Sequence, residues 1–297
     1  MKLVSFGPVG AEQPGLLRDE ETIVPLGPLL AAHGVAAPDM NAVLGLLPAL
    51  AGRPHARVPD GPATVPLAAT RLGPPVPRPG AVIAVGGNYR DHLAQFGEST
   101  APTRPVLFPK PGTSVTGPRD DIVVPHETAM LDYECELGVV IGRGGRRIPR
   151  AEALDHVGGY LIANDVTARD VFLGESAISP LYMQVLRGKG YDSFCPTGPW
   201  LVTPDEFGDP AAARLRTWVN GELRQDGSAA DMIFAVADLI ASVSEFCTLR
   251  PGDIILTGSP AGIGFTMQPP QFLVDGDEVR MEITGIGEIV NTIRAEK

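Results

Sequence analysis

The stretch that decides the fold reads LDYECELGVVIG over residues 131–142. Glu134 and Glu136 stand two residues apart in this strand-like run, and because side chains alternate along a strand, both carboxylates point to the same face. The opposite face carries residues that suit a packed core, namely Tyr133, Cys135 and Leu137. The two glutamates therefore face either a polar cavity or water.

A second stretch, GGYLIANDVTARD at residues 158–170, supplies a third acid where Asp165 ends an apolar run. Carboxylates that lie side by side in segments otherwise built of Val, Ile, Leu and Gly repel one another unless a positive charge neutralises them. Mg²⁺ prefers oxygen ligands, and Mn²⁺ accepts the same oxygen-rich site. The pattern therefore predicts a divalent metal held by Glu134, Glu136 and Asp165. The alternative is that the two glutamates lie on the solvent face of a half-buried strand.

Composition limits the partners of this chain. The 297 residues include 24 basic and 35 acidic side chains, for a net charge of −11, which argues against a nucleic acid or an anionic membrane as the main partner. The three cysteines form no CxxC pair and suit buried thiols in a reducing compartment. The N-terminus lacks the apolar core of a signal peptide, and the longest uncharged runs are broken by Pro and Gly. We expect a soluble, cytoplasmic protein.

The chain divides at a proline-rich stretch that runs from Pro59 to Pro79. We expect a small N-terminal α/β domain over residues 1–70, a linker over 71–80 and the main domain over 81–297. The small domain offers a strand at 2–6 and helical pieces at 27–34 and 39–51. Its histidines, His33 and His55, are interpreted as surface or loop residues. The abundance of Gly and Pro, 35 and 30 residues, predicts many turns and short strands, hence a β-rich α+β fold.

The main domain opens with AVIAVGGNYRDHLAQFG at 81–97, in which an apolar strand leads through a Gly-Gly turn to Tyr89 and His92. A histidine titrates near neutral pH and can serve as a general base, although a capping or surface histidine is the simpler alternative. The next loop sets Lys110 in a proline-rich, apolar context that can line a pocket or form a hairpin.

Three later segments add candidate residues. Arg169 lies four residues after Asp165, on the same side of a helix expected to start there, so it either holds Asp165 or binds a substrate carboxylate. Lys189 stands between two glycines, where a cation suits an anionic ligand, although a flexible surface lysine is the alternative. Thr257 follows a strand and enters a glycine-rich loop that can hold an oxyanion. The less polar residues 173–187 are interpreted as a lid or a dimer contact.

Six motifs, in this order and spacing, resemble the fumarylacetoacetate hydrolase family over residues 80 to 295: NYRDH, FPKPGTSVTGP, LDYECELGVVIG, NDVTARD, GKGYDSFCPTGP and GDIILTGSPAGIGF. The resemblance implies a mixed β-roll of packed sheets with few helices, a homodimer, and Mg²⁺ or Mn²⁺ held by carboxylates. It implies that Glu134, Glu136 and Asp165 are the metal ligands and His92 the catalytic histidine. It further implies that Lys189 contacts the oxo-acid end of the substrate, that Arg169 is a neighbouring site residue and that Thr257 supplies a hydroxyl.

This chain departs from the family pattern at two positions. Many relatives carry Glu three residues after the histidine, whereas this chain has Gln95, which can orient a water but cannot accept its proton. Relatives also tend to carry Gln where this chain has Phe172. The resemblance implies metal-dependent hydrolysis of a C–C bond in an acylpyruvate-type 1,3-diketo acid. Decarboxylation or isomerisation of an oxo-acid on the same site, and a non-catalytic ligand-binding homologue, are the alternatives.

Overall fold

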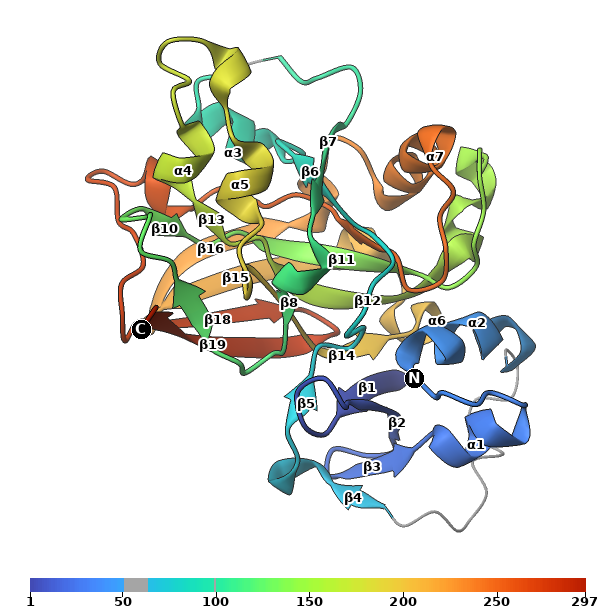
Figure 1. Ribbon diagram of the computed structural model, residues 1–297. Coiled ribbons are helices and arrows are strands. Elements are labelled where there is room, and N and C mark those ends of the chain that lie inside the picture. The colour runs from blue at the N-terminus through green and yellow to red at the C-terminus, as the bar shows by residue number, and fades with distance from the viewer. Residues whose placement is uncertain (51–63, 99) are drawn as a thin grey trace.

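The structure is a computed structural model that describes residues 1–50, 64–98 and 100–297 (Figure 1). Some predictions fall partly or wholly outside these residues, namely the surface position of His55 and the start of the proline-rich stretch at Pro59. The end of the helix expected over 39–51 lies there as well.

In the described part of the chain, the larger sheet has 12 strands. Its main path runs β4-β3-β2-β1-β14-β12-β11-β17-β6-β7, with β5 paired to β1 and β8 paired to β14. The strands are β1 Lys2–Phe6, β2 Gln13–Leu17, β3 Thr22–Pro25, β4 Val65–Pro66, β5 Leu72–Gly73, β6 Val82–Gly86, β7 Val106–Lys110, β8 Val115–Thr116, β11 Cys135–Ile141, β12 Val157–Asn164, β14 Cys195–Val202 and β17 Ile254–Leu256.

A second sheet runs in the order β16-β15-β18-β19-β9, and β10 and β13 form a separate pair. Asn220 and Gly221 join β15 to β16 with positive φ angles of 50° and 81°, as the Asn-Gly hairpin signal predicts. The strands are β9 Ile122–Val124, β10 Leu131–Asp132, β13 Thr167–Ala168, β15 Arg214–Val219, β16 Glu222–Ser228, β18 Glu278–Ile283 and β19 Gly287–Ala295.

The helices are short and lie mainly outside the sheets (Figure 1). The helix expected over 230–247 begins later, because the Asp238 carboxylate accepts the Ala235 amide and caps the helix there. None of the helices in the described ranges has the length and apolar content needed to span a bilayer. They are α1 Gly27–Ala32, α2 Met40–Leu50, α3 Arg90–Gln95, α4 Arg169–Leu173, α5 Val185–Lys189, α6 Pro204–Phe207 and α7 Val236–Phe246.

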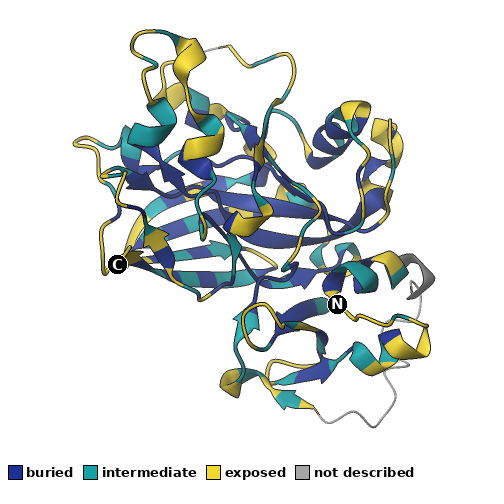
Figure 2. Cartoon of the chain, in the orientation of Figure 1, coloured by how far each residue is buried: buried dark blue, intermediate teal, exposed yellow. Residues whose placement is uncertain are grey.

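The core lies between the two sheets. The second sheet packs against β11, β12 and β14, and the buried side chains between them belong to one apolar cluster. Figure 2 shows the buried residues of these strands in dark blue. Tyr133, Cys135 and Leu137 belong to this cluster, as their alternation predicts. The mixed, β-rich fold with few helices is therefore confirmed. It leaves β11 buried along its whole length, so any polar side chain on this strand needs a partner.

The N-terminal strands extend the larger sheet. β1 pairs antiparallel with β14, with Lys2 opposite Val202 and Leu3 opposite Leu201. A separate small cluster, formed by Val4, Phe6, Leu17 and Ile23, packs beside it. The division into domains over 1–70 and 81–297 stays a prediction, and backbone pairing joins the first of these regions to the second.

Candidate active site

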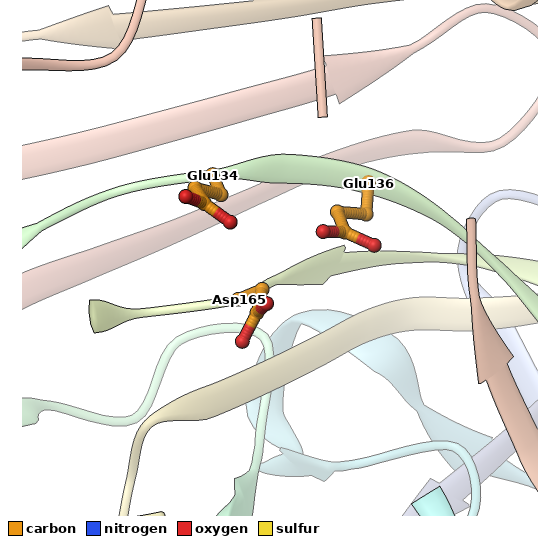
Figure 3. Close-up of side chains that lie close together, drawn as sticks. All are labelled: Glu134, Glu136 and Asp165. Atoms are coloured by element: carbon orange, nitrogen blue, oxygen red, sulfur yellow. The ribbon is translucent and has the colours of Figure 1, made fainter. Parts of the chain in front are cut away.

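Three carboxylates meet where β11 begins and β12 ends. The register pairs Glu136 with Ala163, and the Asp165 amide donates to the Glu134 carbonyl at 2.9 Å, so the two glutamates face Asp165 across neighbouring strands. One oxygen from each of the three side chains lies within 4.8 Å of the others (Figure 3). The solvent-face alternative is wrong, because Glu134 and Glu136 are only 7% and 1% exposed.

Glu134 itself lies just outside the strand that was expected to hold both glutamates. β10 ends at Asp132 and β11 begins at Cys135. The Glu134 amide donates to the Asn164 side-chain oxygen at 3.0 Å instead of to a backbone carbonyl of a neighbouring strand. Both carboxylates still reach the same site.

Two lysines neutralise part of this charge. Lys189, at the end of α5, donates to Glu134 at 2.9 Å, to Asp165 at 2.6 Å and to the Thr167 hydroxyl at 2.8 Å. Lys110, on β7, donates to the other Asp165 oxygen at 2.7 Å and also to the Lys189 carbonyl. The resemblance implied a site role for Lys189, whereas Lys110 was placed only in a segment that either lines a pocket or forms a hairpin. The sequence signal that could have indicated a buried, paired Lys110 is its place inside an apolar, proline-rich segment.

Arg169 occupies a different place from the one its spacing suggested. β13 follows Asp165, and α4 begins only at Arg169, so no helix joins the two residues. The guanidinium donates to Asp132 at 2.8 Å and to Glu134 at 2.6 Å. Asp132 is fully buried and was missed by the sequence analysis, although it stands two residues before Glu134 in the same motif.

The carboxylates differ in how much positive charge lies beside them, and this difference favours a bound metal. Burial acts to raise the pKa of Glu134, but Lys189 and Arg169 outweigh it and hold that pKa below its usual range. Glu136 has a single described donor, the Gly258 amide at 2.7 Å. Burial and the charges of Asp165 and Glu134 raise the pKa of Glu136 well above its usual range. A buried carboxylate short of positive charge, with two acids beside it, is a donor set that Mg²⁺ or Mn²⁺ fits.

Three further candidate residues present unpartnered atoms. His92 lies on α3 with 9% exposure, and its Nδ1 has no hydrogen-bond partner among the described residues. The same holds for the buried hydroxyls of Tyr89 and Thr257. Burial lowers the pKa of His92, although Glu134 acts in the opposite direction, and burial raises the pKa of Tyr89. The site therefore combines a neutral imidazole with two hydroxyl groups that have unused hydrogen-bonding capacity.

In the described part of the chain, Gln95 and Phe172 make their contacts outside this group. Gln95 is exposed at the end of α3, and its side-chain oxygen accepts the Gly262 amide at 3.0 Å. Phe172, on α4, packs against α5, where a Cβ added to Gly188 would lie 2.5 Å from the Phe172 Cα. This close approach helps to position α5, and with it the Lys189 side chain that binds the carboxylates.

Replacing Gly188 with Ala tests this contact. The added carbon meets backbone atoms of Phe172, so α5 must move, and overpacking of this kind costs about 1–3 kcal/mol. We expect a lower melting temperature in calorimetry and weaker metal binding, because Lys189 moves with α5. Gly45→Ala on α2 is the matched control, since a Cβ there meets nothing within 4 Å. A Gly188→Ala protein as stable as the wild type would contradict this packing argument.

A buried carboxylate triad on packed sheets, with Lys189 bound to two of its members, is a group that could hold a divalent metal. The sequence model of the fumarylacetoacetate (FAA) hydrolase C-terminal family matches residues 81–294, and the chain belongs to this family. The chain is 45% identical over 231 residues to the oxaloacetate tautomerase YisK of Bacillus subtilis. The aligned region covers 76% of this chain and 74% of that protein.

Solved structures of the same fold agree with this assignment. The fumarylacetoacetate hydrolase of Exiguobacterium antarcticum is 38% identical, with a TM-score of 0.82 and full coverage of both chains. The maleylpyruvate hydrolase of Sphingobium sp. SYK-6, in complex with manganese (II) and pyruvate, is 32% identical, with a TM-score of 0.81 and full coverage of both chains. The β-roll expected from the sequence is therefore confirmed, and relatives of this fold carry out both hydrolysis and tautomerisation.

Proposed function

We propose that the protein is a divalent-metal-dependent tautomerase that interconverts the enol and keto forms of a 2-oxo acid. The observation that carries this proposal is the environment of His92. In the described residues no carboxylate hydrogen-bonds to its ring, and the Gln95 oxygen at the family's acid position is used by Gly262. Hydrolysis needs an activated water, whereas tautomerisation needs only a proton to be moved.

Glu134, Glu136 and Asp165 are the residues that would hold the metal. When bound, Mg²⁺ or Mn²⁺ would act as a Lewis acid towards the oxo group of the substrate. Lys189 and Arg169 fix the orientation of Glu134 through their hydrogen bonds. This function extends to the present chain the activity named for YisK.

Ketonisation only moves a proton from oxygen to carbon, and His92 is a residue that can carry it. The enol gives up its hydroxyl proton and C3 gains one, so no water is consumed and no bond between carbons breaks. His92 is neutral because burial lowers its pKa, and a neutral imidazole can accept a proton and return it. Tyr89 stays protonated because burial raises its pKa, so its hydroxyl can donate to a substrate oxygen.

The second candidate is the C–C hydrolysis expected from the sequence. The observation in its favour is the similarity to the maleylpyruvate hydrolase that contains manganese and pyruvate. Decarboxylation of an oxaloacetate-like acid uses the same metal chemistry. A non-catalytic homologue that only binds an oxo acid would keep the carboxylates without turnover.

Metal removal and substrate choice separate these functions. We expect the purified protein with Mg²⁺ or Mn²⁺ to accelerate the decay of the oxaloacetate enol absorbance, and EDTA to abolish the acceleration. Acetylpyruvate and fumarylpyruvate test hydrolysis, which pyruvate release reports. Pyruvate released from oxaloacetate reports decarboxylation. If neither enol decay nor pyruvate release is accelerated for any of these acids with either metal, the protein is not an enzyme of this kind, and the ligand-binding alternative is left.

A further inference from the structure

The loop at residues 258–265, called the closing loop here, follows β17 and is held by side chains. Its backbone amides donate to four side chains from three different parts of the chain. The bonds are Gly258 to Glu136 at 2.7 Å, Ala261 to Asp91 at 3.2 Å, Gly262 to Gln95 at 3.0 Å, Gly264 to Asp132 at 2.8 Å and Phe265 to Asp132 at 3.1 Å. Tyr133 and Gln225 also donate to loop carbonyls, those of Gly262 and Pro260, so side chains rather than strand pairing hold this loop.

The closing loop connects both sides of the site. The Phe265 ring centroid lies 5.9 Å from the Arg169 guanidinium carbon and 6.3 Å from the Phe96 ring, in a stacked arrangement. Phe96 in turn meets the His92 ring edge-on at 5.2 Å. A row of four side chains thus runs from the candidate base to the cation that holds Glu134. Displacing the closing loop would disturb both ends of this row.

We propose that Gln95 is a positioning residue that ties the closing loop to α3 and so keeps Phe265 against both Arg169 and Phe96. Its side-chain oxygen accepts the Gly262 amide at 3.0 Å, which is the contact that joins α3 to the loop. Asp91 makes the parallel bond one turn earlier on the same helix, to the neighbouring amide of Ala261. Two acceptors on one helix therefore hold two consecutive amides of one loop.

The inference requires an acceptor at position 95 but no particular charge. Glutamate can accept the Gly262 amide as well as glutamine does, whereas leucine has a similar size and no acceptor. Gln95→Glu and Gln95→Leu therefore form a matched pair. Because Gln95 is exposed at a helix end, both variants are expected to fold, and circular dichroism checks this. Gln13→Leu, at an exposed position on β2, controls for a general effect of the substitution.

Hydrogen exchange of the closing loop is the first measurement, because it needs neither metal nor substrate. In Gln95→Leu we expect the amides of the 261–265 segment to exchange about five-fold faster or more, the order expected for loss of one hydrogen bond. Gln95→Glu and Gln13→Leu should exchange like the wild type. Unchanged protection in Gln95→Leu, or equal loss of protection in both Gln95 variants, would overturn the proposal.

The second measurement is oxalate binding to the Mn²⁺-loaded protein by calorimetry. We expect Gln95→Leu to bind oxalate about ten-fold more weakly, the lower end of the effect seen when a supporting contact of a metal site is lost, while Gln95→Glu keeps the wild-type affinity. If all the proteins bind oxalate with equal affinity, the inference that the closing loop influences the metal site is wrong. The kinetic relevance rests on the proposed function. If the wild type turns over no 2-oxo acid, that function fails, while hydrogen exchange still decides the role of Gln95.

Discussion

Replacing Glu136 with Ala is expected to abolish metal binding together with activity. Glu136 is the carboxylate with the least compensation in the site, since its one described donor is the Gly258 amide and its neighbours Glu134 and Asp165 repel it. Loss of a supporting contact lowers metal affinity about 10–100-fold, so loss of a ligand should cost at least about 100-fold. Calorimetric titration with Mn²⁺ measures this directly, and the enol assay measures the activity.

Two further variants sharpen this test. Glu136→Gln keeps the shape and can still accept the Gly258 amide, but it removes a charge that the neighbouring acids oppose. We expect its metal-free form to melt no lower than the wild type, and Mn²⁺ to raise its melting temperature no further. Glu152→Ala, at an exposed position, should behave like the wild type. Stoichiometric metal in Glu136→Ala would show that the ligand assignment is wrong.

The carboxylate site was predictable because its signal is local. Glu134 and Glu136 stand two residues apart next to a buried strand, and Asp165 ends the strand that pairs with it. Period-two alternation fixes which side chains share a face, and it does so without knowledge of distant partners. The same reasoning correctly assigned Tyr133, Cys135 and Leu137 to the core.

The partners of these carboxylates were harder to predict because they come from distant parts of the chain. Lys110 reaches Asp165 across 55 residues, and the closing loop reaches Asp132 across 132 residues. Arg169 illustrates the error that follows. A helical spacing from Asp165 was assumed, but β13 intervenes and turns the guanidinium towards Asp132 and Glu134. Sequence spacing predicts contacts only within one regular element.

The segment at residues 173–187, interpreted as a lid or a dimer contact, remains exposed in the single chain. Ile178 and Leu181 are 74% and 89% exposed. This segment borders a pocket of about 970 Å³ between α4 and α5, whose walls include Asp170, Tyr182 and Arg187. A homodimer stays a prediction, as does the role of this segment.

Replacing His92 with Ala is expected to leave the metal in place and to remove most of the activity. His92 makes no recorded hydrogen bond to a carboxylate of the triad, so its loss should change the affinity for Mn²⁺ little. General acid–base catalysis contributes about 10²–10⁴-fold, and we expect kcat to fall by that order. His126→Gln, at an exposed histidine, is the matched control and should retain full activity.

The pH dependence gives His92 a signature that a packing role would not produce. A base must be deprotonated to act, so activity falls as pH falls through its pKa. Burial sets the pKa of His92 below the ordinary value of 6.5, and the acid limb of the wild-type profile should lie below that value. His92→Ala should lose this limb along with the rate. A variant that keeps the wild-type rate and the same acid limb would assign the proton transfer to a group other than His92.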